Sequence, residues 1–429
     1  MEIQIKLLNT MSTCEALSSS YLLSPQISPI MTTYASNKRY ERKESIVVAM
    51  DIGKKNSRVA FTHFIPDSRP QVYMVTHWPG QGTLDDPAKI PSIVSYQNSV
   101  VKACGLEAIY DFEEHPENVA HWFKLHLHPA TMLQTSDPQR FEIPPLPIGV
   151  TIERVYSDFM RYLMKNTQHF FKRTATNGEQ VWARLRDTIT IVLATPNNWG
   201  IREQATLRKA AIGASLVTKE NARRLVHFIT EAEASVHYML ANSHGEWLKR
   251  DTVFAVIDCG GFTVDTTVYR CVSLDPLDLK EACSSKSVQT GGIFVDREVE
   301  KMLRRRLSGS LYDDPEVIRG MVESFENEVK PVFDDTDEEY GFKCGYERDN
   351  EPSRGINKGK ITISAKDLKD VFDVVISEIV TTCFRSLVDQ KATYAILVGG
   401  FTESPYVRRA LQKALDNIDI QTVRIADHL

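Results

Sequence analysis

Two short stretches place an aspartate and then glycines directly after a run of apolar residues. In IVVAMDIGKKNSRVAF the apolar run leads to Asp51 and Gly53, and in VFAVIDCGGFTVDTTVY it leads to Asp258, Gly260 and Gly261. Glycines in a tight turn let backbone N–H groups surround an anion, and carboxylates beside them suit a hard divalent cation. The two motifs together therefore predict a site for a polyphosphate and its metal ion.

Each motif taken alone is just as typical of an ordinary β-hairpin, with Asp and Gly in the turn between two strands rich in Val, Ile and Thr. The repetition carries more weight, because one copy lies in each half of the chain. A third turn, Gly399-Gly400, stands between an apolar strand and a helix that begins near Pro405. Glycines there let a ligand approach the backbone closely, so this turn is a candidate to contact a nucleoside.

The apolar periodicity of the remaining chain predicts interleaved strands and helices, which indicates the α/β class. The charged, glycine-containing segment 334–360 is expected to be an exposed loop before a strand at 361–364. The other expected strands are 46–51, 57–65, 71–78, 188–194, 253–258, 264–271 and 394–398, and the expected helices are 151–173, 201–215, 221–241, 293–308, 315–332, 365–388 and 403–414.

The composition is that of a soluble globular protein with at least two domains: 429 residues, 42% hydrophobic and 25% charged. A net charge of −5 without long runs of like charge disfavours nucleic acid and anionic membranes as partners. The sequence has no long apolar span and no signal peptide. Seven scattered cysteines without a C-x-x-C pair argue against a disulfide framework and a structural zinc site. We therefore expect a cytoplasmic protein.

The order of the motifs resembles the actin-like ATPase superfamily and, within it, the 70-kDa heat-shock protein family, over about residues 45–425. The turn variants Asp-Cys-Gly-Gly, Thr-Glu-Ala-Glu-Ala and Gly-Gly-Phe-Thr-Glu-Ser-Pro are most similar to the divergent heat shock 70 kDa protein 12-like branch. The segments that carry the resemblance are the first phosphate loop at 51–57, the region of the interdomain proline (Pro196) at 192–215, FITEAEASVHYML at 228–240, the second phosphate loop at 258–265, TGGIFVDREVEKML at 290–303 and the adenosine loop at 399–405.

This resemblance implies an actin-like ATPase (ribonuclease H-like) fold, with two lobes around a nucleotide cleft, each lobe having a core sheet and an inserted subdomain. Lobe I is expected at 45–248 with its insertion at about 86–148. Lobe II is expected at 249–429, with its insertion at about 298–364 and an incomplete C-terminal end. Residues 1–44, rich in Ser, Thr and Pro, are expected to be a disordered tail.

The resemblance also implies ATP or ADP with Mg²⁺ as cofactors. Asp51 and Asp258 would hold the metal through its water shell, and Lys124, Glu231 and Asp258 would be the catalytic residues. Glu231 could also be a solvated carboxylate at a helix start, and an i,i+4 surface pair explains Glu326 and Lys330 equally well. The implied nucleotide contacts are Asp51, Gly53, Lys54, Lys55, Asn56, Gly260, Gly261, Phe262, Thr263, Asp265, Gly291, Gly292, Glu326, Lys330, Gly399, Gly400, Phe401 and Pro405.

Three departures from the family pattern favour ATP binding over turnover. Phe262 replaces a glycine, which is costly if that position needs a positive φ or a tight backbone approach to a phosphate. Lys54 and Lys55 replace Thr-Thr and add positive charge, and Glu403 stands where the main branch has an adenine-packing arginine. The chain also ends at Leu429, before the family's closing helix and substrate domain.

The resulting prediction is a chaperone-like protein that binds Mg-ATP with slow or absent hydrolysis. Unfolded client proteins and co-chaperones are its expected partners. Two alternatives stay open, a non-enzymatic pseudo-ATPase scaffold and a small-molecule kinase of the same superfamily.

Overall fold

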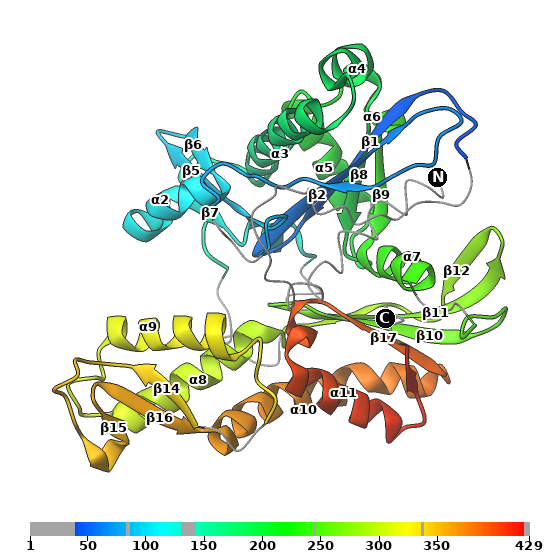
Figure 1. Cartoon of the computed structure of the whole chain (residues 1–429). Helices are drawn as coiled ribbons and strands as arrows, with labels where there is room; N and C mark the ends of the chain where they lie inside the picture. The colour runs from blue at the N-terminus through cyan, green and yellow to red at the C-terminus, as the bar shows by residue number, and fades with distance from the viewer. Residues whose placement is uncertain (1–38, 83–85, 130–142, 243–245, 336–338, 424–429) are drawn as a thin grey trace. The chain divides into compact units, whose positions relative to one another are not determined.

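The computed structural model describes residues 39–82, 86–129, 143–242, 246–335 and 339–423. The chain divides into two compact units, residues 1–242 and 243–429. Each unit contains one six-stranded mixed sheet and one three-stranded sheet (Figure 1). The described structure is thus mixed α/β in both halves.

The large sheet of the first unit has the order β3-β2-β1-β8-β9, with β4 beside β2. β1 and β2 form an antiparallel hairpin, whereas β1, β8 and β9 run parallel to one another. The carboxyl ends of these three parallel strands therefore lie at one edge of the sheet. The strands are β1 (Ser45–Ile52), β2 (Asn56–Phe64), β3 (Tyr73–Met74), β4 (Ile90–Pro91), β8 (Thr190–Thr195) and β9 (Val226–Thr230).

The large sheet of the second unit repeats this topology in the order β12-β11-β10-β17-β18, with β13 beside β11. β10 and β11 form the hairpin, and β10, β17 and β18 are parallel. The two halves are therefore built alike, as the repeated Asp-Gly motif predicts. The strands are β10 (Val253–Cys259), β11 (Val264–Leu274), β12 (Leu277–Glu281), β13 (Lys286–Val288), β17 (Tyr394–Val398) and β18 (Gln421–Thr422).

The apolar run of β1 is continuous because both faces of the sheet are covered. Ile46, Val48 and Met50 belong to the core cluster that includes residues of α3 and α5. Val47 and Ala49 belong to a second cluster, which includes a residue of α7. Successive strand residues point to opposite faces, so a strand buried on both faces carries no polar alternation. The covering helices are α3 (Ile152–Thr174), α5 (Ile201–Gly213) and α7 (Glu231–Asn242).

The smaller elements of the first unit fall into two groups along the sequence. Most stand between β4 and α3, and the others stand between α3 and β9. They include a three-stranded antiparallel sheet in the order β6-β5-β7. Their bounds are β5 (Ile93–Gln97), β6 (Val100–Cys104), η2 (Gly105–Ala108), α2 (Ile109–Glu114), η3 (Pro116–Asn118), β7 (Val119–His121), η4 (Phe123–Leu127), α4 (Gly178–Leu185), η6 (Arg186–Thr188) and α6 (Ala222–Leu225).

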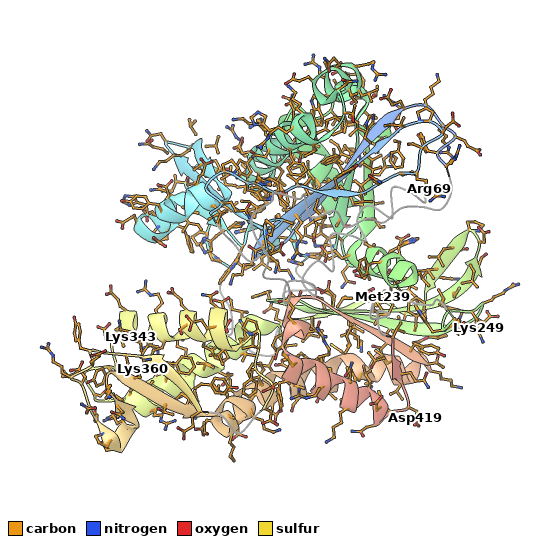
Figure 2. All side chains as sticks on the ribbon, viewed as in Figure 1. Arg69, Met239, Lys249, Lys343, Lys360 and Asp419 are labelled. Carbon is orange, nitrogen blue, oxygen red and sulfur yellow. The ribbon has the colours of Figure 1, made fainter. Side chains whose placement is uncertain are left out.

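In the second unit, α10 and α11 lie along one side of the large sheet (Figure 1). The small antiparallel sheet has the order β14-β16-β15, and Lys343 and Lys360 face each other across β14 and β16 (Figure 2). The bounds are α8 (Gly292–Leu307), α9 (Pro315–Ser324), the π-helix η7 (Phe325–Val329), β14 (Glu339–Lys343), η8 (Pro352–Arg354), β15 (Ile356–Asn357), β16 (Lys360–Ser364), α10 (Ala365–Asp389), η9 (Gly400–Glu403) and α11 (Pro405–Asp416).

Three local expectations are wrong. The helix expected at 221–241 is interrupted by β9, which pairs with β8 along its whole length. The loop expected at 334–360 contains β14, where Phe342 is buried against Phe325. The strand expected at 71–78 is reduced to the two residues of β3, and His77 near its end has a positive φ of 65°. In each case pairing and packing with distant residues decides the local structure.

Residues 39–44 make specific contacts before β1. The Tyr40 ring lies 4.9 Å from that of Phe64, and the Glu44 carboxylate pairs with Arg184 and His63. The rest of the tail expected at 1–44 lies outside the described residues. Within the described ranges, no helix is both long and apolar enough to cross a membrane, and the six cysteines are free thiols.

Candidate functional site

The carboxyl edge of the first sheet gathers several of the expected site residues. Asp51 is the penultimate residue of β1, and Glu231 directly follows β9 as the first residue of α7. By alternation along β1, Asp51 lies on the same face as Val47 and Ala49, the face that α7 covers. Ligands of α/β sheets characteristically bind at the carboxyl ends of parallel strands. The first unit therefore places both carboxylates where a ligand would be expected.

Lys124 joins this edge from a distant segment. Its Nζ donates to Glu231 Oε1 at 2.6 Å, and the two side chains are 4% and 21% exposed. Lys124 lies in the short helix η4, which follows Trp122 in the left-handed region (φ 49°). The same ammonium lies 5.9 Å from the centre of the Trp199 ring. The sequence named Lys124 and Glu231 separately, and the structure brings them into contact.

Trp199 and His128 complete the surroundings of Lys124, and neither was expected from the sequence. Trp199 Nε1 donates to His128 Nδ1 at 3.4 Å, with the ring centres 5.7 Å apart. Burial, reinforced by the charges of Lys54 and Lys124, lowers the pKa of His128 far below its ordinary value, so the ring is neutral. A lone Trp after a turn and a lone His form no motif, so only the fold reveals them.

The first Asp-Gly turn is tight. A Cβ at Gly53 would lie 2.1 Å from the carbonyl oxygen of Asn56, so only glycine fits there. The preceding carbonyl, that of Lys55, accepts from the N–H of Ser92 at 2.8 Å and ties the turn to the chain beyond β4. Lys54 is half-buried, whereas Lys55 and Asn56 are exposed. The turn thus has one fixed shape with its basic residues partly accessible.

The second Asp-Gly turn, residues 260–263, is docked on the start of α8. The carbonyl oxygens of Gly260, Gly261 and Phe262 accept from the N–H groups of Gly292, Ile293 and Gly291, at 3.1, 2.7 and 3.2 Å respectively. In a trans peptide the C=O and the following N–H point in opposite directions. The N–H groups of Gly261, Phe262 and Thr263 therefore point away from α8. Successive N–H groups turned to one side form an anion-binding concavity.

Gly291 and Gly292 support this turn. A Cβ at Gly291 would lie 2.3 Å from the carbonyl oxygen of Gly260, so a larger residue would push the turn away from the helix. A Cβ at Gly292 would lie 3.2 Å from the Phe401 ring. Both glycines therefore act through close packing against the turn and the adjacent η9.

Asp258 and Gly399 converge at the carboxyl edge of the second sheet. Asp258 is the penultimate residue of β10 and is paired in register with Val398 of β17. A Cβ at Gly399 would lie 2.4 Å from Asp258 Oδ1, and Gly399 has a φ of 92°. Thr263 Oγ1 donates to Asp265 Oδ2 at 2.7 Å within the adjoining turn. Asp258 thus occupies in this unit the position that Asp51 has in the first.

The carboxylates fit a hydrated Mg²⁺ better than a metal held directly by protein. Within the described ranges no group of three His, Cys, Asp or Glu side chains is placed to hold a metal ion. Asp51 and Asp258 are hard oxygen donors, which Mg²⁺ prefers, and Mg²⁺ commonly keeps several waters and binds through one or two carboxylates and phosphate oxygens. A role in holding Mg²⁺ for Asp51, in the first unit, and for Asp258, in the second, stays a prediction.

Phe262 and Phe401 are core residues. Phe262 has no positive φ, is 5% exposed and packs against Phe294 at 5.7 Å between ring centres. The positive φ that would make a phenylalanine costly here is therefore absent, whereas a cost from a tight approach of this backbone to a phosphate stays a prediction. Phe401 is also buried and stacks in parallel with Phe372 at 6.5 Å. Pro405 is the first residue of α11, where proline is favoured.

Lys330 is held by an internal partner. Its Nζ donates to both oxygens of Asp296, at 2.7 and 2.6 Å, and the two side chains are 15% and 8% exposed. Glu326 lies 3.9 Å from the same ammonium, which is the i,i+4 pair left open by the sequence. This geometry links α8 to η7. A nucleoside contact by Glu326 or Lys330 stays a prediction.

Two α/β units of the same topology, each with an Asp-Gly hairpin at the carboxyl edge, are consistent with an actin-like two-lobe fold. No protein-family model matches the chain. The chain is 24% identical over 322 residues to heat shock 70 kDa protein 12B of Homo sapiens. The match covers 61% of this chain and 45% of that protein. It thus spans less than half the length of that relative. The similarity supports a distant relationship to the Hsp70-like, actin-like ATPases, and with it nucleotide binding.

Proposed function

We propose that the protein binds Mg-ATP through its two Asp-Gly hairpins and acts as a chaperone-like protein of the 70-kDa heat-shock type with slow or absent hydrolysis. The observation that carries the proposal is the second hairpin turn. Its peptide units turn three successive N–H groups to one side, next to Asp258 and Gly399. Such a concavity suits phosphate oxygens, and the carboxylate beside it suits the accompanying cation.

The first unit supplies the complementary groups. Gly53 to Asn56 would contact the phosphates through the backbone, and Asp51 would hold Mg²⁺ through its waters. The Lys124 ammonium would neutralise charge on the transferred phosphoryl group, while Glu231 and Asp258 would orient the attacking water. The Gly399-Gly400 turn would approach the nucleoside. Mg²⁺, when bound, supplies charge neutralisation at the phosphates.

Slow turnover follows from the extra positive charge in the first turn. Lys54 and Lys55 attract a polyphosphate in the ground state and in the transition state alike. Uniform binding of this kind lowers the dissociation constant without raising the rate of the chemical step. Client proteins and co-chaperones are further parts of the proposal and come from the resemblance to the 70-kDa heat-shock family. A cytoplasmic location is also part of it and comes from the composition and the scattered cysteines.

The test is calorimetric titration with ATP, with and without Mg²⁺, of the wild type, Asp258→Ala and the control Asp278→Ala. Asp278 is an exposed aspartate of β12 in the same unit. Saturable, Mg-dependent binding that is lost only in Asp258→Ala supports the proposal. Absence of binding to the wild type at millimolar ATP overturns it and favours the scaffold alternative. ATP consumption that requires an added sugar or acetate would instead identify a small-molecule kinase.

A further inference from the structure

The Lys124 side chain is a flexible cation in a nearly closed environment. It is 4% exposed, so its ammonium has lost most of its hydration. Its four-carbon stem has many rotamers, and the ion pair with Glu231 constrains the distance of the ammonium more than its direction. Any precise placement of this cation therefore depends on what surrounds the stem and the head group.

Trp199 provides a flat surface for the ammonium. The Lys124 Nζ lies 5.9 Å from the ring centre, within the range of cation–π attraction. Trp199 is itself 5% exposed, and its backbone N–H donates to the Pro196 carbonyl at 3.0 Å in the turn after β8. A small cavity is lined by Trp199, Lys124 and Tyr156 among others, so the indole forms part of the wall beside the lysine.

His128 contacts the indole at its N–H group. An indole N–H can only donate, so His128 Nδ1 is the acceptor of the 3.4 Å hydrogen bond, and the neutral ring carries its proton on Nε2. His128 caps η4, the helix that contains Lys124, and its N–H donates to the Leu125 carbonyl at 3.1 Å. Trp199 therefore contacts the segment around η4 at two points, the Lys124 ammonium and the His128 ring.

We propose that Trp199 is a positioning residue, which, anchored by His128, holds the Lys124 ammonium against Glu231 at the carboxyl edge of the first sheet. The inference rests on the proposed function in that Lys124 would serve a polyphosphate. The attraction needs an aromatic face and is not reproduced by an aliphatic side chain that merely fills space. The experiment must therefore distinguish the aromatic face of Trp199 from the volume that its side chain fills.

The first experiment compares Trp199→Phe, which keeps a ring face and loses the N–H, with Trp199→Leu, which loses both. Trp182→Leu is the matched control, because Trp182 is also 5% exposed in the same unit but belongs to α4. We expect ATP affinity to fall about 10-fold in Trp199→Leu and less than about 3-fold in Trp199→Phe. Trp182→Leu should leave the affinity of the folded protein unchanged. Equal losses in Trp199→Phe and Trp199→Leu would overturn the inference.

The second experiment needs neither nucleotide nor a change at Trp199. The protein has five tryptophans, so its 1H–15N spectrum contains five indole signals, which single Trp→Phe variants assign. Lys124→Met should shift the Trp199 indole signal and leave that of Trp182 in place. An unmoved Trp199 signal would overturn the inference. If the wild type binds no ATP, the proposed function fails while this spectrum still decides whether Trp199 contacts the lysine.

Discussion

The Lys124 ammonium lies 2.6 Å from Glu231 Oε1, although 107 residues separate the two in the sequence. Their exposures differ, because the lysine side chain is 4% exposed and the glutamate 21%. Loss of the Glu231 carboxylate takes an anionic partner away from a buried cation. Loss of the cation leaves a carboxylate that can reach water. We therefore expect removal of the Glu231 charge and removal of the Lys124 charge to lower the free energy of unfolding by different amounts.

We expect Glu231→Gln to lower the free energy of unfolding by about 3 kcal/mol and Lys124→Met by about 1 kcal/mol or less. Denaturant titration of both variants measures the two values. An exposed pair, Glu298 with Lys301, is the control, and Glu298→Gln should change stability by less than about 0.5 kcal/mol. A larger loss in Lys124→Met than in Glu231→Gln would contradict the burial argument.

The contact of Gly291 with the second Asp-Gly turn gives another prediction. An added methyl would lie 2.3 Å from the Gly260 carbonyl oxygen, so Gly291→Ala should displace turn 260–263 and cost about 1–3 kcal/mol of stability. Gly320→Ala, in α9 of the same unit, is the control, since no atom lies within 4 Å of its added Cβ. Thermal unfolding and ATP titration of the two variants provide the comparison. If Gly291→Ala bound ATP as tightly as Gly320→Ala, the turn would not depend on this packing.

The parts of the fold that were predictable depend on local sequence. The β1 and β10 hairpins follow from apolar runs that end in an Asp-Gly turn, and α3 and α10 from long amphipathic periods. β9 was missed because its apolar spacing also fits a helix, and its pairing with β8 is what decides. β14 was missed because it lies in a charged, glycine-containing segment whose composition is typical of an exposed loop, and its pairing with β16 is what decides.

The candidate site likewise contains some residues that the local sequence identifies and others that only the tertiary structure brings together. Asp51, Asp258 and their glycines are recognisable because a turn imposes a fixed spacing on them. Lys124 and Glu231 are joined only by tertiary structure, so the sequence could suggest each but not their contact. Trp199 and His128 leave no sequence signal, because their role arises from one hydrogen bond and one ring contact between separate segments.

Phe262 is expected to matter for stability and not as an obstacle to phosphate binding. Its ring is buried against Phe294, so Phe262→Ala should cost about 3 kcal/mol, measured by denaturant titration. Phe112→Ala, which truncates a ring that is 38% exposed, should cost clearly less. Phe262→Gly, which restores the residue typical of the resembled family, should not raise ATP turnover. A faster and equally stable Phe262→Gly protein would show that the ring obstructs the site.

The depressed pKa of His128 makes stability depend on pH. Burial, together with Lys54 and Lys124, keeps the native ring neutral, whereas the unfolded chain takes up a proton below about pH 6.5. The unfolded state then binds more protons, so stability falls as the pH falls. At pH 5 the loss through this residue should be about 2 kcal/mol, and His128→Gln should remove it. Unfolding of the wild type, His128→Gln and the exposed control His169→Gln between pH 5 and 8 measures this difference. A His128→Gln protein with the pH slope of the wild type would mean that the native ring is protonated.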